Sequence, residues 1–221
     1  MIEILSSLPI PRSLTRESLI KKNRFGYENL ELSSLEKVKL ERVIEAIDHP
    51  EIASLVEEGY LTFAMIKPKA TENILGLSDI GATNAIKDAI EEGGMDIIFD
   101  LSIYFSDSDI EEFYGGGPKE SQIVSPSIRS KHANRWEEFK EYMGEGPTTV
   151  MLLFSRNGNA VEKWRDMIGH WNVQKNRDPK TIRGRFAKDN YTSLVHGSDS
   201  RERVMTEINF VSKHLKNRFF K

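Results

Sequence analysis

The stretch SLVHGSDS, residues 193–200, ends a short apolar run on His196 and then continues in small polar residues. Imidazole titrates near neutral pH, so a histidine at such a break can serve in catalysis. A helix start follows at once, with Asp199 or Ser200 as candidate N-cap and Glu202 completing a capping box with Asp199. The free N–H groups of a helix start favour anions. We therefore expect an anionic ligand beside His196.

Four more polar side chains stand out, three of them at the ends or edges of apolar patterns. Lys67 ends a strand-like run, and Arg165 lies at the edge of a helical apolar stripe. Arg183 falls in an irregular stretch, where a guanidinium can hold phosphate with two N–H groups. Glu207 flanks the last helical stripe, where a carboxylate needs a partner. Each could instead reach solvent from an element end, but together with His196 they indicate one anionic site, with phosphate as its natural ligand.

The overall composition narrows the classes of protein. The chain has 221 residues, 38% of them hydrophobic and 29% charged, with a net charge of −3, which is typical of a globular protein and does not indicate nucleic acid as a partner. No apolar run approaches the roughly 20 residues of a membrane span, and the start lacks a signal-peptide pattern. We expect a cytoplasmic protein without membrane contact. The absence of cysteine excludes disulfides and a thiolate nucleophile.

Periodicity divides the chain into an N-terminal helical part and a mixed part. Residues 1–58 are helical in pattern, with segments at 13–22, 33–50 and 50–59. The segments expected after residue 58 are strand 60–67, helix 78–92, strand 96–105, an interrupted helical region 107–144, strand 148–155, helix 159–169, a strand near 192–196 and a helix from about 199.

This order predicts the fold class. Two βαβ halves joined by a helical insert favour an α+β sandwich, with a ferredoxin-like βαββαβ core and an antiparallel four-stranded sheet covered by helices on one face. We divide the chain into an N-terminal helical extension, 1–58, and a main domain, 59–221, that carries an insert at about 115–135.

Four blocks of the main domain resemble the signature segments of nucleoside diphosphate kinases. They are TFAMIKPKA (62–70), MIGHWN (167–172) with Arg165 before it, DPKTIRGRFAKDN (178–190) and SLVHGSDS followed by Glu207. The blocks occur in the family's order and nearly its spacing, over about residues 60–215. The family has a ferredoxin-like fold. Its members move the terminal phosphate of a nucleoside triphosphate to a nucleoside diphosphate in two steps through a phosphohistidine.

The resemblance assigns roles to the residues at the chemical end of the site. It implies that His196 is the nucleophile and that Glu207 bonds to its ring, which holds its orientation and tautomer. Lys67 would contact the transferring phosphate, and Tyr114 would lie beside the histidine and the lysine. A neutral imidazole is an available nucleophile at pH 7, and covalent capture splits the transfer into two similar steps.

The resemblance also implies how the nucleotide is held. Arg165 and Arg183 would bind the phosphates. Ser198 and Asp199 would lie next to the histidine and its contacts and help to hold it in position. Mg²⁺ would be bound to the phosphates of ATP or another nucleoside triphosphate, with no metal held directly by the protein. Positive groups placed in advance stabilise the charge on the equatorial oxygens in phosphoryl transfer.

Several positions depart from the family, mainly on the sugar and base side. Trp171 stands where a threonine near the phosphates is usual, and Ser193 where an asparagine contacts the sugar. The insert, with about a dozen extra residues, disturbs the segment whose phenylalanine stacks on the base. By count, that position falls on Arg135, with Trp136 next, and a guanidinium or an indole could take over the stacking.

We therefore expect a nucleoside diphosphate kinase that works through phospho-His196, with nucleoside di- and triphosphates as partners. The alternative is a kinase-like module that binds a nucleotide or a protein with little or no turnover, which Trp171 and Ser193 favour. A histidine phosphocarrier fed by another kinase has less support, because the nucleotide-contacting arginines are present. We expect a homo-oligomer, since the family commonly forms hexamers or tetramers, and the extension could replace packing or subunit contacts.

Overall fold

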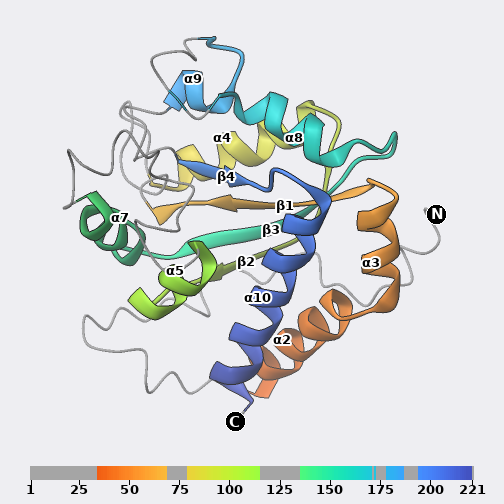
Figure 1. Ribbon diagram of the computed structural model, residues 1–221, viewed down its shortest axis with the longest axis vertical. Coiled ribbons are helices and arrows are strands. Elements are labelled where there is room, and N and C mark those ends of the chain that lie inside the picture. The colour runs from red at the N-terminus through yellow and green to blue at the C-terminus, as the bar shows by residue number, and fades with distance from the viewer. Residues whose placement is uncertain are drawn as a thin grey trace.

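The computed structural model describes residues 34–68, 79–114, 135–170, 172, 178–186 and 194–220 (Figure 1). The helix expected at 13–22 and almost all of the insert lie outside the described residues. The elements are α2 (Ser34–Ile47), α3 (Pro50–Glu57), β1 (Leu61–Ile66), α4 (Asp79–Glu92), β2 (Asp96–Ile103), α5 (Asp107–Tyr114), α7 (Arg135–Gly144), β3 (Thr148–Phe154), α8 (Ala160–Ile168), α9 (Ile182–Phe186), β4 (Val195–Gly197) and α10 (Arg201–Phe219).

The sheet has four strands in the order β2-β3-β1-β4, and each adjacent pair is antiparallel. All residues of β1 and β3 are buried, which agrees with their continuous apolar sequences LTFAMI and TTVMLLF. β4 is short and pairs with the end of β1. The order and pairing confirm the predicted α+β class and the ferredoxin-like core.

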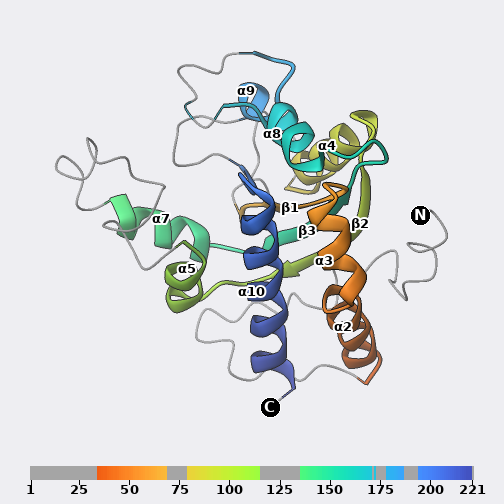
Figure 2. The same cartoon turned by 45° about the vertical axis from the view of Figure 1, so that its right-hand side comes forward.

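Helices cover both faces of the sheet, so the expectation of one covered face was wrong. Leu61, Phe63 and Met65 of β1 belong to a core shared with α2, α3, α5, α7 and α10. Ala64 and Ile66 belong to a second core, which is shared with α4, α8 and α9. These three helices lie on the opposite side of the sheet from α2, α5 and α10 (Figure 2). Successive residues of a strand alternate between the two faces of the sheet. The continuous apolar strands β1 and β3 therefore place apolar side chains on both faces, and both faces must be covered by helices.

The N-terminal helices α2 and α3 pack into the same core as α10. Leu40, Val43 and Ile47 of α2 and Ile52 of α3 are buried there. Polar contacts reinforce this packing, because Ser212 Oγ on α10 donates to Asp48 Oδ1 at 2.7 Å, and Lys216 Nζ lies 2.5 Å from Asp48 Oδ2. The two helices are therefore attached to the helix that carries Glu207.

Helices α5 and α7 pack against each other beside the C-terminal end of β1. Tyr114 meets Phe139 with ring centroids 5.0 Å apart, and Trp136 stacks on Phe139 at 5.8 Å. The aromatic cluster continues through Phe113 towards α10. The rings of Phe113 and Tyr114 also contact that of His196, which places the end of α5 next to β4. In the described part of the chain, no helix combines the length and apolar character needed to cross a membrane.

Candidate active site

The pairing of β1 with β4 brings the predicted lysine and histidine to one end of the sheet. His196 is the partner of Met65 in the antiparallel register, so its side chain shares a face with Phe63 and Met65. Lys67 follows two residues after Met65, and its backbone N–H donates to Leu194 O at 2.8 Å. This face is where α5 and α10 also converge.

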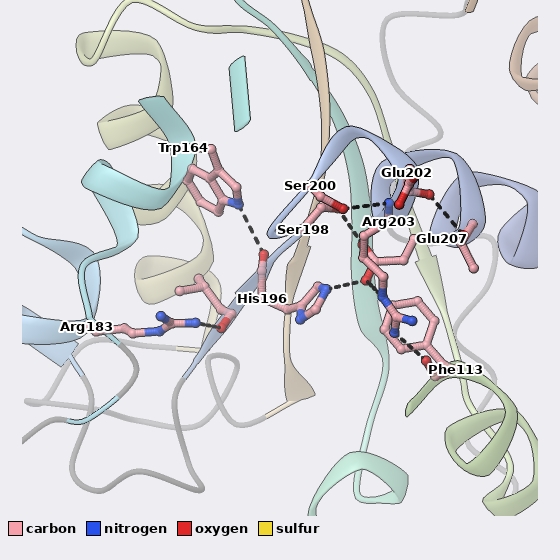
Figure 3. Close-up of polar contacts among 11 residues, drawn as sticks. Phe113, Trp164, Arg183, His196, Ser198, Ser200, Glu202, Arg203 and Glu207 are labelled. Atoms are coloured by element: carbon pink, nitrogen blue, oxygen red, sulfur yellow. Dashed lines mark hydrogen bonds and ion pairs between the residues drawn. The ribbon is translucent and has the colours of Figure 1, made fainter. Parts of the chain in front are cut away.

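Glu207 fixes one nitrogen of the His196 ring (Figure 3). His196 Nε2 lies 2.9 Å from Glu207 Oε1, and Ser198 Oγ donates to Glu207 Oε2 at 2.5 Å. Glu207 is only 1% exposed. Burial acts to raise the pKa of Glu207, but the neighbouring His196, Ser198 and Arg203 outweigh burial and lower the pKa overall. An ionised acceptor at Nε2 favours the tautomer that carries its proton there, which leaves the lone pair on Nδ1.

The start of α10 accounts for the position of Glu207. Ser200 is the N-cap, and its side chain accepts a hydrogen bond from Arg203 N at 3.1 Å. Of the two candidates, Ser200 rather than Asp199 therefore caps the helix. Asp199 is exposed, whereas Ser198 is fully buried against Glu207. Glu207 then lies on the inner face of α10, two turns after the cap.

Aromatic rings enclose the imidazole. The ring centroids of Phe63, Phe113 and Tyr114 lie 6.4, 5.5 and 6.0 Å from that of His196, all in edge-on arrangements. Edge-on contacts of this kind are favourable and directional. Phe113 was missed in the sequence, although its position directly before Tyr114 could have indicated it. The imidazole is therefore restrained by packing as well as by Glu207.

The backbone around His196 is equally restricted. Trp164 Nε1 on α8 donates to His196 O at 3.1 Å. A Cβ atom at Gly197 would lie 2.5 Å from the Trp164 ring, so no larger residue fits there without movement. Only glycine allows this close approach of β4 to α8.

Lys67 is buried beside the same aromatic cluster. Its side chain is 6% exposed, and Nζ lies 5.3 Å from the centroid of the Phe139 ring. Burial, and next the positive charge of Arg183, lower the pKa of Lys67 from 10.5 to about 7. A buried cation near a second cation favours a bound anion, because an anion would compensate both charges.

Arg183 supplies that second cation from α9. Its Nη1 donates to Gly169 O at 2.8 Å, and its Nη2 donates to Val195 O at 3.2 Å. Burial, and then the charge of Arg165 on α8, lower the pKa of Arg183 to about 10. Arg165 itself is exposed. Arg183 therefore interacts electrostatically with both of the other predicted cations, Lys67 and Arg165.

Two buried donors at the site lack a partner within the described part of the chain. They are Tyr114 Oη and Arg183 Nε. Burial and the charge of Glu207 raise the pKa of Tyr114 far above its ordinary value, so its hydroxyl remains a donor at neutral pH. Buried donors without partners are costly, and a phosphate group would satisfy them.

The residues predicted on the sugar and base side are mostly not described. Trp171 and Ser193 lie outside the described residues, as does the side chain of Arg135. Trp136 is described and is only 4% exposed, with its indole stacked on Phe139. A base could stack on this indole only if neighbouring atoms moved. The predicted residues that the structure brings together are therefore those expected around the reacting phosphate.

Sequence reasoning missed Arg203, which contacts Glu207 directly. Arg203 Nε donates to Glu207 Oε1 at 2.8 Å. A spacing of four residues on a helix places two side chains on one face, so the pair was visible in RERVMTE. Among the residues that the structure describes, no group of three or more His, Asp or Glu side chains is arranged to hold a metal ion.

The fold and the site together define a ferredoxin-like protein with a carboxylate-oriented histidine and a group of cations at one end of its sheet. Comparison with known families agrees with this description. The family model described as nucleoside diphosphate kinase matches residues 61–216. The match begins at β1 and ends within α10, so it contains every described residue of the site.

Individual relatives carry the same name. A nucleoside diphosphate kinase of Bartonella tribocorum is 33% identical over 151 residues, covering 67% of this chain and 90% of the relative. One of Brucella canis is 34% identical over 149 residues, covering 66% and 89%. Among solved structures, the Aquifex aeolicus nucleoside diphosphate kinase superposes with a TM-score of 0.53 at 25% identity, covering 69% of this chain and 94% of that one. The chain belongs to the nucleoside diphosphate kinase family.

Proposed function

We propose that this protein is a nucleoside diphosphate kinase that transfers the γ-phosphate of a nucleoside triphosphate to a nucleoside diphosphate by a ping-pong mechanism through phospho-His196. The observation that carries the proposal is the His196–Glu207 pair, whose Nε2 to Oε1 distance is 2.9 Å, on the same end of the sheet as Lys67 and Arg183. Membership of the family supports the substrate class.

The first half-reaction follows from the contacts of His196. With Nε2 directed at Glu207, the lone pair on Nδ1 attacks the γ-phosphorus. A bond forms between Nδ1 and phosphorus, the bond to the β–γ bridging oxygen breaks, and the nucleoside diphosphate leaves with that electron pair. Positive charge develops on the imidazole during attack, and the buried carboxylate of Glu207 stabilises it. The second half-reaction reverses these steps with another nucleoside diphosphate.

The cations and the tyrosine would hold the phosphate. In a loose transition state the charge lies on the equatorial oxygens, and pre-positioned donors stabilise it without reorganisation. Lys67, Arg165 and Arg183 supply positive charge, and Tyr114 supplies a neutral donor. Mg²⁺ would be bound to the phosphates of the nucleotide and would add positive charge there.

The alternative function is a kinase-like module that binds a nucleotide or a protein with little turnover. The burial of Trp136 favours it, because one of the two residues expected to stack on the base is not exposed. A histidine phosphocarrier remains a weaker alternative, because Arg165 and Arg183 are both present on the phosphate side. We also propose, from family membership, that the enzyme acts in the cytoplasm as a homo-oligomer.

Labelling with γ-³²P-ATP separates these functions. We expect the wild-type protein to take up an acid-labile label, His196→Ala to take up none, and a nucleoside diphosphate to discharge the label as nucleoside triphosphate. His49→Ala is the matched control, because this exposed histidine at the start of α3 lies outside the proposed machinery and the variant should label normally. No label on the wild type at millimolar nucleotide would reject the kinase. A label that a diphosphate cannot discharge would favour the phosphocarrier.

A further inference from the structure

The guanidinium of Arg203 joins two parts of the site that come from different elements (Figure 3). On one side, its Nε donates to Glu207 Oε1 at 2.8 Å. On the other side, its Nη2 donates to Phe113 O at 2.6 Å, and its carbon Cζ lies 5.5 Å from the centroid of the Phe113 ring. Arg203 therefore connects α10 with the end of α5.

The contact with Glu207 completes the coordination of a buried charge. Glu207 Oε1 accepts hydrogen bonds from Arg203 and His196, and Oε2 accepts one from Ser198. A carboxylate that is 1% exposed requires such compensation. When His196 is ready to attack, its imidazole is neutral, and so is the hydroxyl group of Ser198. Among these three partners of Glu207, Arg203 is therefore the one that carries a permanent charge. It can hold the carboxylate in place throughout both half-reactions.

The contact with Phe113 fixes the end of α5, which carries the aromatic rings that pack against His196. The last carbonyl groups of a helix have no partner within the helix, and Arg203 satisfies that of Phe113. The rings of Phe113 and Tyr114 lie edge-on to His196, with centroids 5.5 and 6.0 Å away. A shift of the α5 end would therefore move both rings relative to the imidazole.

We propose that Arg203 is a positioning residue for phosphoryl transfer, which holds Glu207 and the end of α5 in one fixed relation to His196. This inference rests on the proposed function and adds a residue that the family resemblance did not indicate. Arg203 acts through Glu207 and Phe113, so its removal should slow the transfer step without weakening nucleotide binding. A misplacement of reacting groups by about 1 Å can cost on the order of 100-fold in rate.

An ordinary surface role is the competing explanation. The Arg203 side chain is 35% exposed, and exposed pairs spaced four apart on a helix contribute little. Such a pair would affect stability slightly and would leave kinetics unchanged. The experiment must therefore separate a kinetic effect from a stability effect.

The test compares three variants by rapid-quench phosphorylation with a triphosphate, discharge by a diphosphate, and steady-state kcat and KM. We expect Arg203→Met to lower kcat and both single-turnover rates by roughly 10- to 100-fold, with KM within about threefold. Arg203→Lys keeps the charge but cannot make both contacts, so it should fall between. Lys213→Met is the control. It removes another α5–α10 ion pair, Lys213 Nζ to Glu112 Oε1 at 2.7 Å, and should leave the rates unchanged.

A second readout does not depend on activity. The ¹⁵N NMR signals of the His196 ring report whether Nε2 alone carries the proton, and we expect this signature in the wild type and its loss in Arg203→Met. Unchanged rates and ring signals in Arg203→Met and Arg203→Lys would overturn the inference while leaving the proposed kinase intact. If the wild type forms no phosphohistidine, the proposed function fails, and unchanged ring signals would then overturn the positioning role separately. Should Arg203→Met not fold, Arg203→Lys supports the same comparison.

Discussion

His196 on β4 and Glu207 on α10 form a hydrogen-bonded pair, with Nε2 of the imidazole 2.9 Å from Oε1 of the buried carboxylate. The two residues are held by different means. His196 is fixed by strand pairing with Met65 and by Trp164, whose indole donates to its carbonyl. Glu207 is fixed by the cap of α10 and by Ser198. The pair therefore links the sheet register to the start of one helix.

Replacing Glu207 by glutamine should slow phosphorylation of His196 while leaving the fold nearly intact. The amide keeps the size and one acceptor of the carboxylate but loses the charge that stabilises the imidazole as it becomes positive. We expect kcat of Glu207→Gln to fall on the order of 100-fold and the circular dichroism spectrum to stay the same. Steady-state kinetics with nucleotide pairs measures this. A variant with wild-type kcat would show that the carboxylate has no electrostatic role.

Replacing Lys67 by methionine should have opposite effects on stability and activity. Burial and Arg183 lower the pKa of Lys67 from 10.5 to about 7 in the folded state. The unfolded chain therefore binds more protons between about pH 7 and pH 10.5, so in wild type this group's contribution to the free energy of unfolding rises over that window. Lys67→Met lacks this dependence and should be more stable than wild type at pH 7.

Urea unfolding at pH 7 and pH 9.5 checks the stability half of this prediction. The difference in stability between Lys67→Met and wild type should shrink at the higher pH. Phosphorylation of the variant should be slower by on the order of 100-fold, because a donor to the transferring phosphate is gone. An identical pH dependence of unfolding in the two proteins would contradict the lowered pKa of Lys67.

Replacing Asp109 by asparagine should weaken the attachment of α5 to α10 and change acid stability. Asp109 Oδ1 lies 3.0 Å from His214 Nδ1, and Ser106 N donates to Oδ2 at 2.8 Å. Burial opposes ionisation of Asp109, but the hydrogen bonds from His214 and Ser106 outweigh it and lower its pKa from 3.8 to about 2. The resulting stabilisation is fully present above about pH 4 and is lost as the pH falls through 2.

We expect Asp109→Asn to lower the free energy of unfolding at pH 6 by about 2 kcal/mol. The difference from wild type should decrease between pH 4 and pH 2, as urea unfolding at several pH values will show. Asp107→Asn, at an exposed position on the first turn of α5, is the control and should behave as wild type. If both variants lose stability equally, the His214 contact does not carry the effect.

Replacing Gly197 by alanine should disturb His196 through its own backbone. The added Cβ would lie 2.5 Å from Trp164, so β4 or α8 must move. Overpacking of this kind costs about 1–3 kcal/mol, and the displaced histidine should lower kcat as well. Gly144→Ala is the control, because a Cβ there meets nothing within 4 Å. Thermal unfolding and steady-state rates measure both effects, and wild-type values for Gly197→Ala would contradict the tight approach.

Local sequence patterns were sufficient for much of the fold and the site. Alternating and continuous apolar runs predicted each strand to within a few residues, and the cap signal at Asp199 or Ser200 predicted the start of α10, where the structure selects Ser200. Polar residues that break such runs predicted His196 and Glu207, because a buried carboxylate or imidazole is costly unless it has a partner. Family resemblance added Tyr114, which no local pattern singled out.

The sequence by itself therefore determined the order of the helices and strands and the residues that could take part in chemistry. Both depend on neighbours within one helical turn or one strand. The tertiary structure alone decided which faces are covered, that Trp136 is buried, and that Arg203 reaches Phe113, ninety positions away in the chain. Contacts of this kind depend on how α5, α10 and the sheet pack together. Packing across distant segments leaves no periodic signal in the residues that take part in it.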